Sequence, residues 1–203
     1  MKLYRKVIAV LLMLVASVPV FAATADAELA ALRKKMSAPS VEAFFTIDGL
    51  EGPVQGSATM AGAKIAMTTP QMCVWYDGTT QWTYITASRE LNISEPDATE
   101  LLATNPFAIL SAGSGEYSCK KLADASGKTR LELTPADTSA GIAKIQVSVN
   151  RSTGWPSDIK VTFTDGRTIS LKVDKISAGK AKPASTFRYN KAAYPASEII
   201  DLR

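Results

Sequence analysis

The sequence has no histidine among its 203 residues. Histidine is the usual general base of hydrolases, the commonest metal ligand and the main sensor of physiological pH. Two carboxylate pairs could still act as acid and base, Asp48 with Glu51 and Asp97 with Glu100. Both pairs lie at expected turns or helix starts, where carboxylates usually cap helices or face solvent. We therefore expect no enzyme, no catalytic residue, no metal site and no cofactor.

Long apolar runs are also scarce, and the longest, Val7–Val18, follows three basic residues near the N-terminus. Small residues then occur at spacings that fit cleavage after Ala22 or Ala25. The run is too short to span a membrane. We expect residues 1–22 to be a secretory signal peptide, with the cleavage site between 22 and 25, and residues 26–203 to form one exported, soluble domain.

The exported chain has little net charge. Without Lys2, Arg5 and Lys6 of the expected signal peptide, the 23 basic residues fall to 20, against 19 acidic ones. A chain so balanced gives no electrostatic reason to expect a nucleic acid or an anionic membrane as partner. We expect no nucleic acid to bind.

Cysteine is also scarce, since only Cys73 and Cys119 are present. Disulfides persist in exported proteins, so a bond between these two residues is one interpretation. The other interpretation is a pair of buried thiols on neighbouring strands. The sequence does not choose between the two.

The exported chain begins with a helical pattern and then changes to a period of two. Leu29, Leu32 and Met36 lie at helical spacing, with acidic residues in the first turn and basic residues in the last. Apolar residues alternate with polar ones from residue 41 to 47. This predicts a helix at 26–37 followed by a strand.

Two features follow in the same region. Phe44 interrupts the alternation, and we expect its side chain to lie under the first helix. Gly49–Gly56 contains three glycines and Pro53, which predicts a loop. This loop lacks the Gly-Lys-Ser/Thr ending of a phosphate-binding loop, so we expect a plain turn. Residues 57–69 predict one or two further strands.

The stretch from Met72 to Gly113 organises the rest of the chain. Two aromatic segments flank an Asp77-Gly78 pair, which predicts a tight hairpin. Two short helices are expected to start at Pro96 and Pro106, where a missing N–H costs nothing. A sheet with aromatic side chains followed by apolar helices is either an ordinary packed core or an apolar hollow with a lid.

Short alternating runs fill the chain from residue 117 to 173, separated by glycine-containing turns. They predict an antiparallel meander with one apolar face. In the C-terminal tail, Phe187–Tyr189 is a candidate last strand. Ala196–Leu202 is either a final turn of helix or an edge strand.

The order of these elements resembles the LolA-like family of periplasmic outer-membrane lipoprotein carrier proteins, across nearly the whole exported chain. The segments that carry the resemblance are Val41–Thr46, Tyr76–Tyr84, Asn105–Phe107, Leu131–Pro135, the hairpin at 154–166 and Thr186–Tyr189. The resemblance implies a mainly β fold of the α+β class. It implies an incomplete antiparallel β-barrel with helices covering the concave apolar face.

The resemblance also implies a function and partners. Such a carrier takes acylated lipoproteins from an inner-membrane lipoprotein-releasing transporter, shields their acyl chains and carries them through the periplasm to the outer membrane. An outer-membrane acceptor is a further candidate partner, and we expect a monomer. One departure concerns Ala61–Pro70, where proteobacterial relatives carry an arginine-containing segment that takes part in gating. Here the segment is shorter, and Lys64 is its only cation.

A usable carrier has to hold acyl chains loosely. At about 0.8 kcal/mol per CH₂, several fully buried chains would exceed the practical affinity ceiling of roughly 18–21 kcal/mol. Methionine and aromatic side chains give a yielding surface, and apolar helices can cover it when it is empty. The residues that we expect to bind lipid are Phe45, Met60, Ile65, Met67, Val74, Trp82, Tyr84, Leu101, Leu102, Phe107 and Leu110.

A second class of function remains open. A LolA-like envelope sensor or a structural β-module would carry no lipid cargo. An internal apolar cavity discriminates between these classes, because a carrier needs one and a fully packed module does not.

Overall fold

The computed structural model describes residues 24–49, 52–111, 115–137 and 141–203. The expected signal peptide at residues 1–22 lies outside the described residues and stays a prediction. No helix in the described ranges combines the length and apolar character needed to cross a bilayer.

One twelve-stranded sheet organises the chain, in the order β12-β6-β5-β4-β3-β2-β1-β11-β10-β9-β8-β7. Its strands are β1 (Ser40–Gly49), β2 (Gly52–Ala61), β3 (Lys64–Thr68), β4 (Met72–Tyr76), β5 (Gln81–Ile85), β6 (Glu90–Ser94), β7 (Tyr117–Ala125), β8 (Lys128–Pro135), β9 (Ile142–Asn150), β10 (Pro156–Phe163), β11 (Thr168–Gly179) and β12 (Glu198–Asp201). Neighbours run antiparallel except for β12, which runs parallel to β6. Across the described strands β12 and β7 end the sheet without pairing, so the expected incomplete barrel is confirmed.

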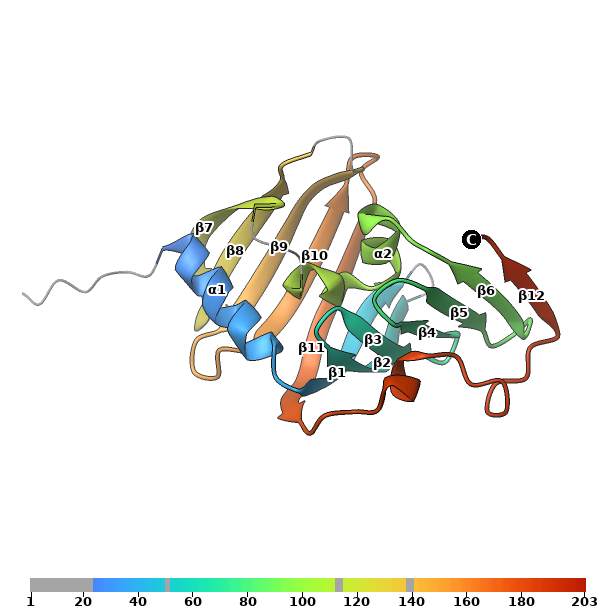
Figure 1. Ribbon diagram of the computed structural model, residues 1–203. Helices are drawn as coiled ribbons and strands as arrows, with labels where there is room; N and C mark the ends of the chain where they lie inside the picture. Colours follow the sequence, from blue (N-terminus) through green and yellow to red (C-terminus); the bar gives the residue numbers. More distant parts are fainter. Residues whose placement is uncertain (1–23, 50–51, 112–114, 138–140) are drawn as a thin grey trace, which may run out of the picture.

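Helices lie inside the curl of this sheet (Figure 1). They are α1 (Ala25–Met36), α2 (Ala98–Thr104) and the 3₁₀ helix η1 (Pro106–Leu110), while a second 3₁₀ helix, η3 (Ala184–Phe187), belongs to the C-terminal tail. The expected first helix is confirmed, with a Thr24 side-chain cap and with Leu29 and Leu32 buried. Acidic residues in its first turn and basic residues in its last suit the helix dipole.

The hairpin on Asp77-Gly78 is also confirmed. Backbone N–H groups of Thr79 and Thr80 donate to Asp77 Oδ1 at 3.2 and 3.1 Å, and Gly78 has φ +105°. Few residues other than glycine adopt such a φ, so the turn needs Gly78. The turn fixes the register, with Tyr76 opposite Gln81.

The loop expected at Gly49–Gly56 is wrong, because β2 already begins at Gly52. Pro53 is tolerated since β3 pairs only with Ser57–Ala61, which leaves the first half of β2 at an edge. Gly56 faces Phe45 across the strands, and a Cβ there would lie 2.5 Å from the Phe45 ring. The glycine therefore makes room for an aromatic ring and does not form a turn.

Three smaller expectations need correction. Phe44 does not lie under α1 but is 57% exposed on the opposite face of β1, next to a bulge in the pairing with β11. Pro96 precedes the first residues of α2, whose cap is Asp97, whereas Pro106 does start η1. The candidate strand at Phe187–Tyr189 is instead the end of η3 and the segment after it.

Two apolar clusters form on the two faces of the sheet around β4. The main core, on the side of α1, α2 and η1, receives Val74 and Tyr76. A second cluster receives Cys73 and Trp75 from the opposite face of the same strand. Its remaining members are Tyr84 and Leu91, with Ala66, Trp82, Ile93, Tyr189, Tyr194 and Ala196 packed against them.

Candidate lipid-binding site

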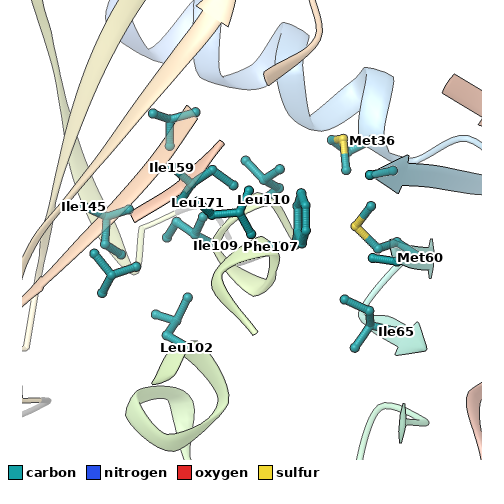
Figure 2. Packing of buried hydrophobic residues seen from close by; sticks show 14 of the residues in the cluster. Met36, Met60, Ile65, Leu102, Phe107, Ile109, Leu110, Ile145, Ile159 and Leu171 are labelled. Carbon is teal, nitrogen blue, oxygen red and sulfur yellow. The ribbon is translucent and has the colours of Figure 1, made fainter. Parts of the chain in front are cut away.

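The 3₁₀ helix η1 fills the inner face of the curled sheet. Phe107, Ile109 and Leu110 are only 3%, 1% and 3% exposed. The Phe107 ring meets the Phe45 ring edge-on, with 5.7 Å between centroids. Figure 2 shows Phe107 on the side of η1 toward Met60 and Ile109 on the other side. The helix therefore fills the inner face of the sheet, and we call it the plug.

Helices α2 and η1 form one unit, residues 97–111, which we call the flap. Asp97 and Glu100 make a capping box: Asp97 Oδ1 accepts from the Glu100 N–H at 2.8 Å, and Glu100 Oε2 accepts from the Asp97 N–H at 3.1 Å. Asn105 joins the two helices, because its N–H donates to Leu101 O and its Oδ1 accepts from the Phe107 N–H. These hydrogen bonds are internal to the flap, so they can survive a movement of the whole unit.

One polar contact ties the flap to the sheet at Gln81. The Thr104 hydroxyl donates to Gln81 Oε1 at 3.1 Å, and Gln81 Nε2 donates to Thr83 Oγ1 at 3.3 Å. Gln81 is 5% exposed, so both of its polar atoms need partners. Otherwise the inner surface of η1 meets the sheet through apolar side chains.

Two hollows flank η1. The first, of about 270 Å³, is lined by Arg33, Met36, Ser37, Met60, Gly62, Ala63, Lys64, Ile65, Asn105, Phe107, Ala108, Leu110 and Ser111. The second, of about 180 Å³, is lined by Ala63, Tyr76, Ala98, Leu101, Leu102, Ala108, Ile109, Ser111, Glu116 and Tyr117. Ala63, Ala108 and Ser111 line both, so the hollows are adjacent and these three residues lie between them.

Two ionisable groups near α1, Tyr117 and Cys119, have raised pKa values. Burial raises the pKa of Tyr117, nearby Glu116 raises it further, and Arg33 opposes both. Burial likewise raises the pKa of the Cys119 thiol, with Asp26 adding to the shift and Arg33 opposing it. The interior beside α1 is therefore apolar enough to disfavour charge.

Residues 37–165 match the family model described as outer membrane lipoprotein carrier protein LolA. The chain belongs to this family. The match covers the flap, both sides of the β2–β3 turn and most of the sheet, but not Arg33 of α1. No curated protein sequence matches the chain.

The chain is similar to solved structures of low sequence identity, and the first two below share its fold. An uncharacterised conserved protein from Thermus thermophilus is 13% identical, with 87% of this chain and 98% of that chain covered and a TM-score of 0.59. A DUF1329 family protein from Desulfovibrio piger is 9% identical, with 84% and 99% covered and a TM-score of 0.50. A LolA superfamily protein from Nitrosomonas europaea is 14% identical, with 83% and 99% covered and a TM-score of 0.48.

The structure brings together nine of the eleven residues expected to bind lipid. Those in or against the main core are Phe45, Met60, Ile65, Met67, Val74, Leu101, Leu102, Phe107 and Leu110. Of these, Met60, Ile65, Phe107 and Leu110 line the first hollow, and Leu101 and Leu102 line the second. Trp82 and Tyr84 lie elsewhere, in the second cluster.

The hairpin register explains why Trp82 and Tyr84 are separated from the rest. Trp82 pairs with Trp75, and Val74 pairs with Thr83. Paired residues project to the same face of a sheet. Val74 and Tyr84 therefore cannot share a face, and counting outward from the Asp77 turn would have revealed this.

Sequence reasoning also missed several lining residues. Arg33 and Met36 come from the last turn of α1, while Ala63 and Ala108 are small residues that line both hollows. Met36 had a usable signal, because it belongs to the apolar stripe of α1. The two alanines had none, since small residues occur in every element.

The two cysteines are free thiols on strands that are not neighbours. Cys73 of β4 is buried in the second cluster. Cys119 of β7 is half-buried against the main core, with its Sγ 3.6 Å from Ala25 O. The two cysteines therefore form no disulfide, and they do not lie on neighbouring strands.

The carboxylate pairs considered for catalysis have structural explanations where they are described. Asp97 and Glu100 form the capping box of α2. Glu51 lies outside the described residues, so the pair with Asp48 has no geometry to assess. The described residues hold no group of three or more Cys, Asp or Glu side chains arranged to bind a metal ion.

Proposed function

We propose that the protein is a periplasmic carrier that shields the acyl chains of lipoproteins and transfers them from the inner to the outer membrane. The observation that supports this proposal is the pair of hollows on the two sides of η1, whose residues Phe107, Ile109 and Leu110 are buried against the inner face of the sheet. The side chains of the flap occupy the surface that an acyl chain would cover.

The volumes support an exchange of plug for cargo. Ligand pockets usually measure about 300–1,000 Å³. Both hollows, at about 270 and 180 Å³, are smaller than the lower end of that range. An outward movement of η1 would join both hollows into one trough, because Ala108 and Ser111, which line both, belong to the flap.

The energies of this exchange are balanced enough for a carrier. Exposing three large apolar side chains costs about 1.5–3 kcal/mol each, or about 5–9 kcal/mol together. A sixteen-carbon acyl chain gains about 12 kcal/mol on leaving water. The net gain of a few kcal/mol is enough to hold cargo and small enough to release it to an acceptor.

The proposal includes the location and partners implied by the family. The expected signal peptide exports the chain to the periplasm. There it would act without catalysis, as a monomer, receiving acylated lipoproteins from an inner-membrane lipoprotein-releasing transporter. An outer-membrane acceptor would take them over.

The test is mass spectrometry of the protein purified without detergent from its native envelope. The carrier proposal predicts co-purifying acylated lipoprotein, released when the sample is extracted with detergent. A protein that is recovered folded and free of acyl chains, even when its transporter is intact, would contradict the proposal. That result would favour the envelope sensor or the structural β-module.

A further inference from the structure

The first hollow combines an apolar floor with a cationic rim. Met36, Met60 and Phe107 line it together with Arg33 and Lys64. Among residues that line the two hollows, these two are the cations, and the acid Glu116 lines the second hollow. The charged residues that line the first hollow are therefore basic, and the one that lines the second hollow is acidic.

Within the described part of the chain, Arg33 and Lys64 form no ion pair. Arg33 Nε is buried without a hydrogen-bond partner in the same part of the chain. A buried donor without an acceptor is unfavourable, so it is rare unless a ligand completes it.

The neighbouring cation on α1 shows the contrast. Lys35 donates a hydrogen bond to Thr153 O and lies 4.6 Å from the centre of the Trp155 ring. Lys35 therefore fastens α1 to the β9–β10 turn. Arg33 lies one turn before Ser37 on the face that meets the hollow, where no such partner is present among the described residues.

We propose that the first hollow binds the anionic group of an amphiphile, with Arg33 and Lys64 contacting the anion and the acyl chain running beside Phe107. This rests on the proposed function, because it uses the same surface under η1. Carboxylate and phosphate both match a guanidinium beside an ammonium. The acyl chains of a lipoprotein are attached through uncharged ester, amide and thioether groups. An anionic preference therefore adds free fatty acids or lysophospholipids to the cargo.

Calorimetric titration of the purified, delipidated chain tests this with four lauryl amphiphiles below their micelle concentrations. They are laurate, lauroyl lysophosphatidylglycerol, neutral monolaurin and cationic dodecyltrimethylammonium. At low salt we expect at least one anion to bind about tenfold more tightly than monolaurin, and the cation to bind most weakly. Preference for laurate alone identifies fatty acid as the source of the anion, and preference for the lysophospholipid alone identifies a phospholipid headgroup.

Variants locate the effect. Arg33→Gln and Lys64→Gln should each lower the ratio of laurate to monolaurin affinity several-fold, and Arg33→Lys should retain most of it. Lys34→Gln removes the same charge from an exposed position of α1 that does not line the hollow, so the ratio should not change. An equal loss in Lys34→Gln would overturn the proposal, because it would reflect net charge alone.

Failure of this inference is distinguishable from failure of the carrier proposal. Equal binding of all four amphiphiles overturns the anionic site and leaves the carrier standing. Acetate binding as tight as laurate also overturns it, since the chain would then contribute nothing. If none of the amphiphiles binds, both proposals fail.

Discussion

The sheet has an apolar surface on each face near β4, and the two surfaces are covered in different ways. The C-terminal tail covers the second cluster and is tied down by polar contacts. Arg89 donates to Pro195 O at 3.2 and 3.0 Å, the Tyr84 hydroxyl donates to the same oxygen at 3.4 Å, and the Tyr189 hydroxyl donates to Tyr194 O at 2.6 Å.

Aromatic packing completes this cover. The Tyr194 ring lies 4.9 Å from Trp75 and 5.6 Å from Tyr84, and Tyr189 lies 5.9 Å from Trp75, all in edge-on geometry. Strand β12 then adds backbone pairing to β6. A cover fixed by directional hydrogen bonds and ring packing cannot leave without breaking each of them.

The flap covers the main core with apolar side chains, and its hydrogen bonds close mostly on itself. It leaves hollows on both sides, while the tail lies directly on aromatic rings. Apolar contacts are non-directional, so an acyl chain can replace them at little net cost. Under the carrier proposal, the tail is therefore a permanent cover and the flap an exchangeable one.

The largest expected effect comes from Phe107→Asp. A carboxylate on the inner side of η1 would be buried without a partner, so it should destabilise the closed flap by several kcal/mol and repel acyl chains. We expect co-purified acyl cargo to fall more than tenfold, measured by mass spectrometry.

The matched control is Phe44→Asp, which makes the same change at a residue that is 57% exposed on the outer face of β1. It should leave cargo unchanged. If Phe107→Asp does not fold by circular dichroism, Phe107→Ala replaces it and should enlarge the hollow and change cargo affinity. If a folded Phe107 variant carries as much cargo as the wild type, the claim that η1 occupies the cargo-binding surface is wrong.

Trp75→Ala should have the next largest effect, on stability alone. Removing this buried ring from the second cluster should cost about 3–5 kcal/mol of unfolding free energy, measured by urea denaturation. Cargo binding by the folded fraction should not change, because the ring faces away from η1. Loss of cargo in proportion to stability would mean that the two surfaces do not act separately.

Thr104→Val tests the polar contact between flap and sheet. It removes the hydroxyl that donates to Gln81 Oε1 and should cost about 1–3 kcal/mol, mainly in the closed state. We expect faster uptake of a fluorescent acyl probe in stopped-flow experiments. Thr83→Val, which removes the other partner of Gln81 within the sheet, is the control and should not accelerate uptake.

The smallest effect concerns the tail at Asp77. Burial raises the pKa of Asp77, but N–H groups of Thr80 and Thr79 and the Arg188 guanidinium outweigh it, so the pKa lies below its ordinary value. Arg188 Nη2 lies 3.0 Å from Asp77 Oδ2, and its side chain is 63% exposed. Such an exposed pair contributes no more than about 1 kcal/mol.

The pH dependence of this contribution has a defined sign. A lowered folded-state pKa stabilises the fold above the unfolded pKa of about 3.9, and the effect disappears as pH falls through the folded value. Asp77→Asn should therefore be slightly less stable than the wild type at neutral pH and equal to it in strong acid, by urea denaturation at each pH. A constant difference across this range would exclude the ion pair as its cause.

The sequence predicted the architecture because its patterns are local. Alternating apolar residues, the Asp77-Gly78 turn and the capped first helix each specify an element without reference to distant contacts. The loop expected at Gly49–Gly56 failed for a non-local reason. Gly56 is required by the Phe45 ring on the opposite strand, and composition alone cannot distinguish that from a turn.

The candidate site was predictable to the extent that it follows strand register. Met60, Ile65 and Phe107 line the same hollow, because apolar residues at these positions belong to one face or one short helix. Trp82 and Tyr84 lie on the other face of the sheet, which the hairpin register determines and residue type does not. Arg33 was missed since only the packing of α1 against β7 and η1 brings it to the hollow.

The most direct test of the exchangeable cover is hydrogen exchange with and without a synthetic acylated cysteinyl peptide. With the peptide bound, amides of residues 97–111 should lose protection as η1 leaves the sheet, while amides of β4, β5 and the tail should keep theirs. Unchanged or increased protection of the flap with the peptide bound would contradict the account, because the ligand would then bind without displacing the plug.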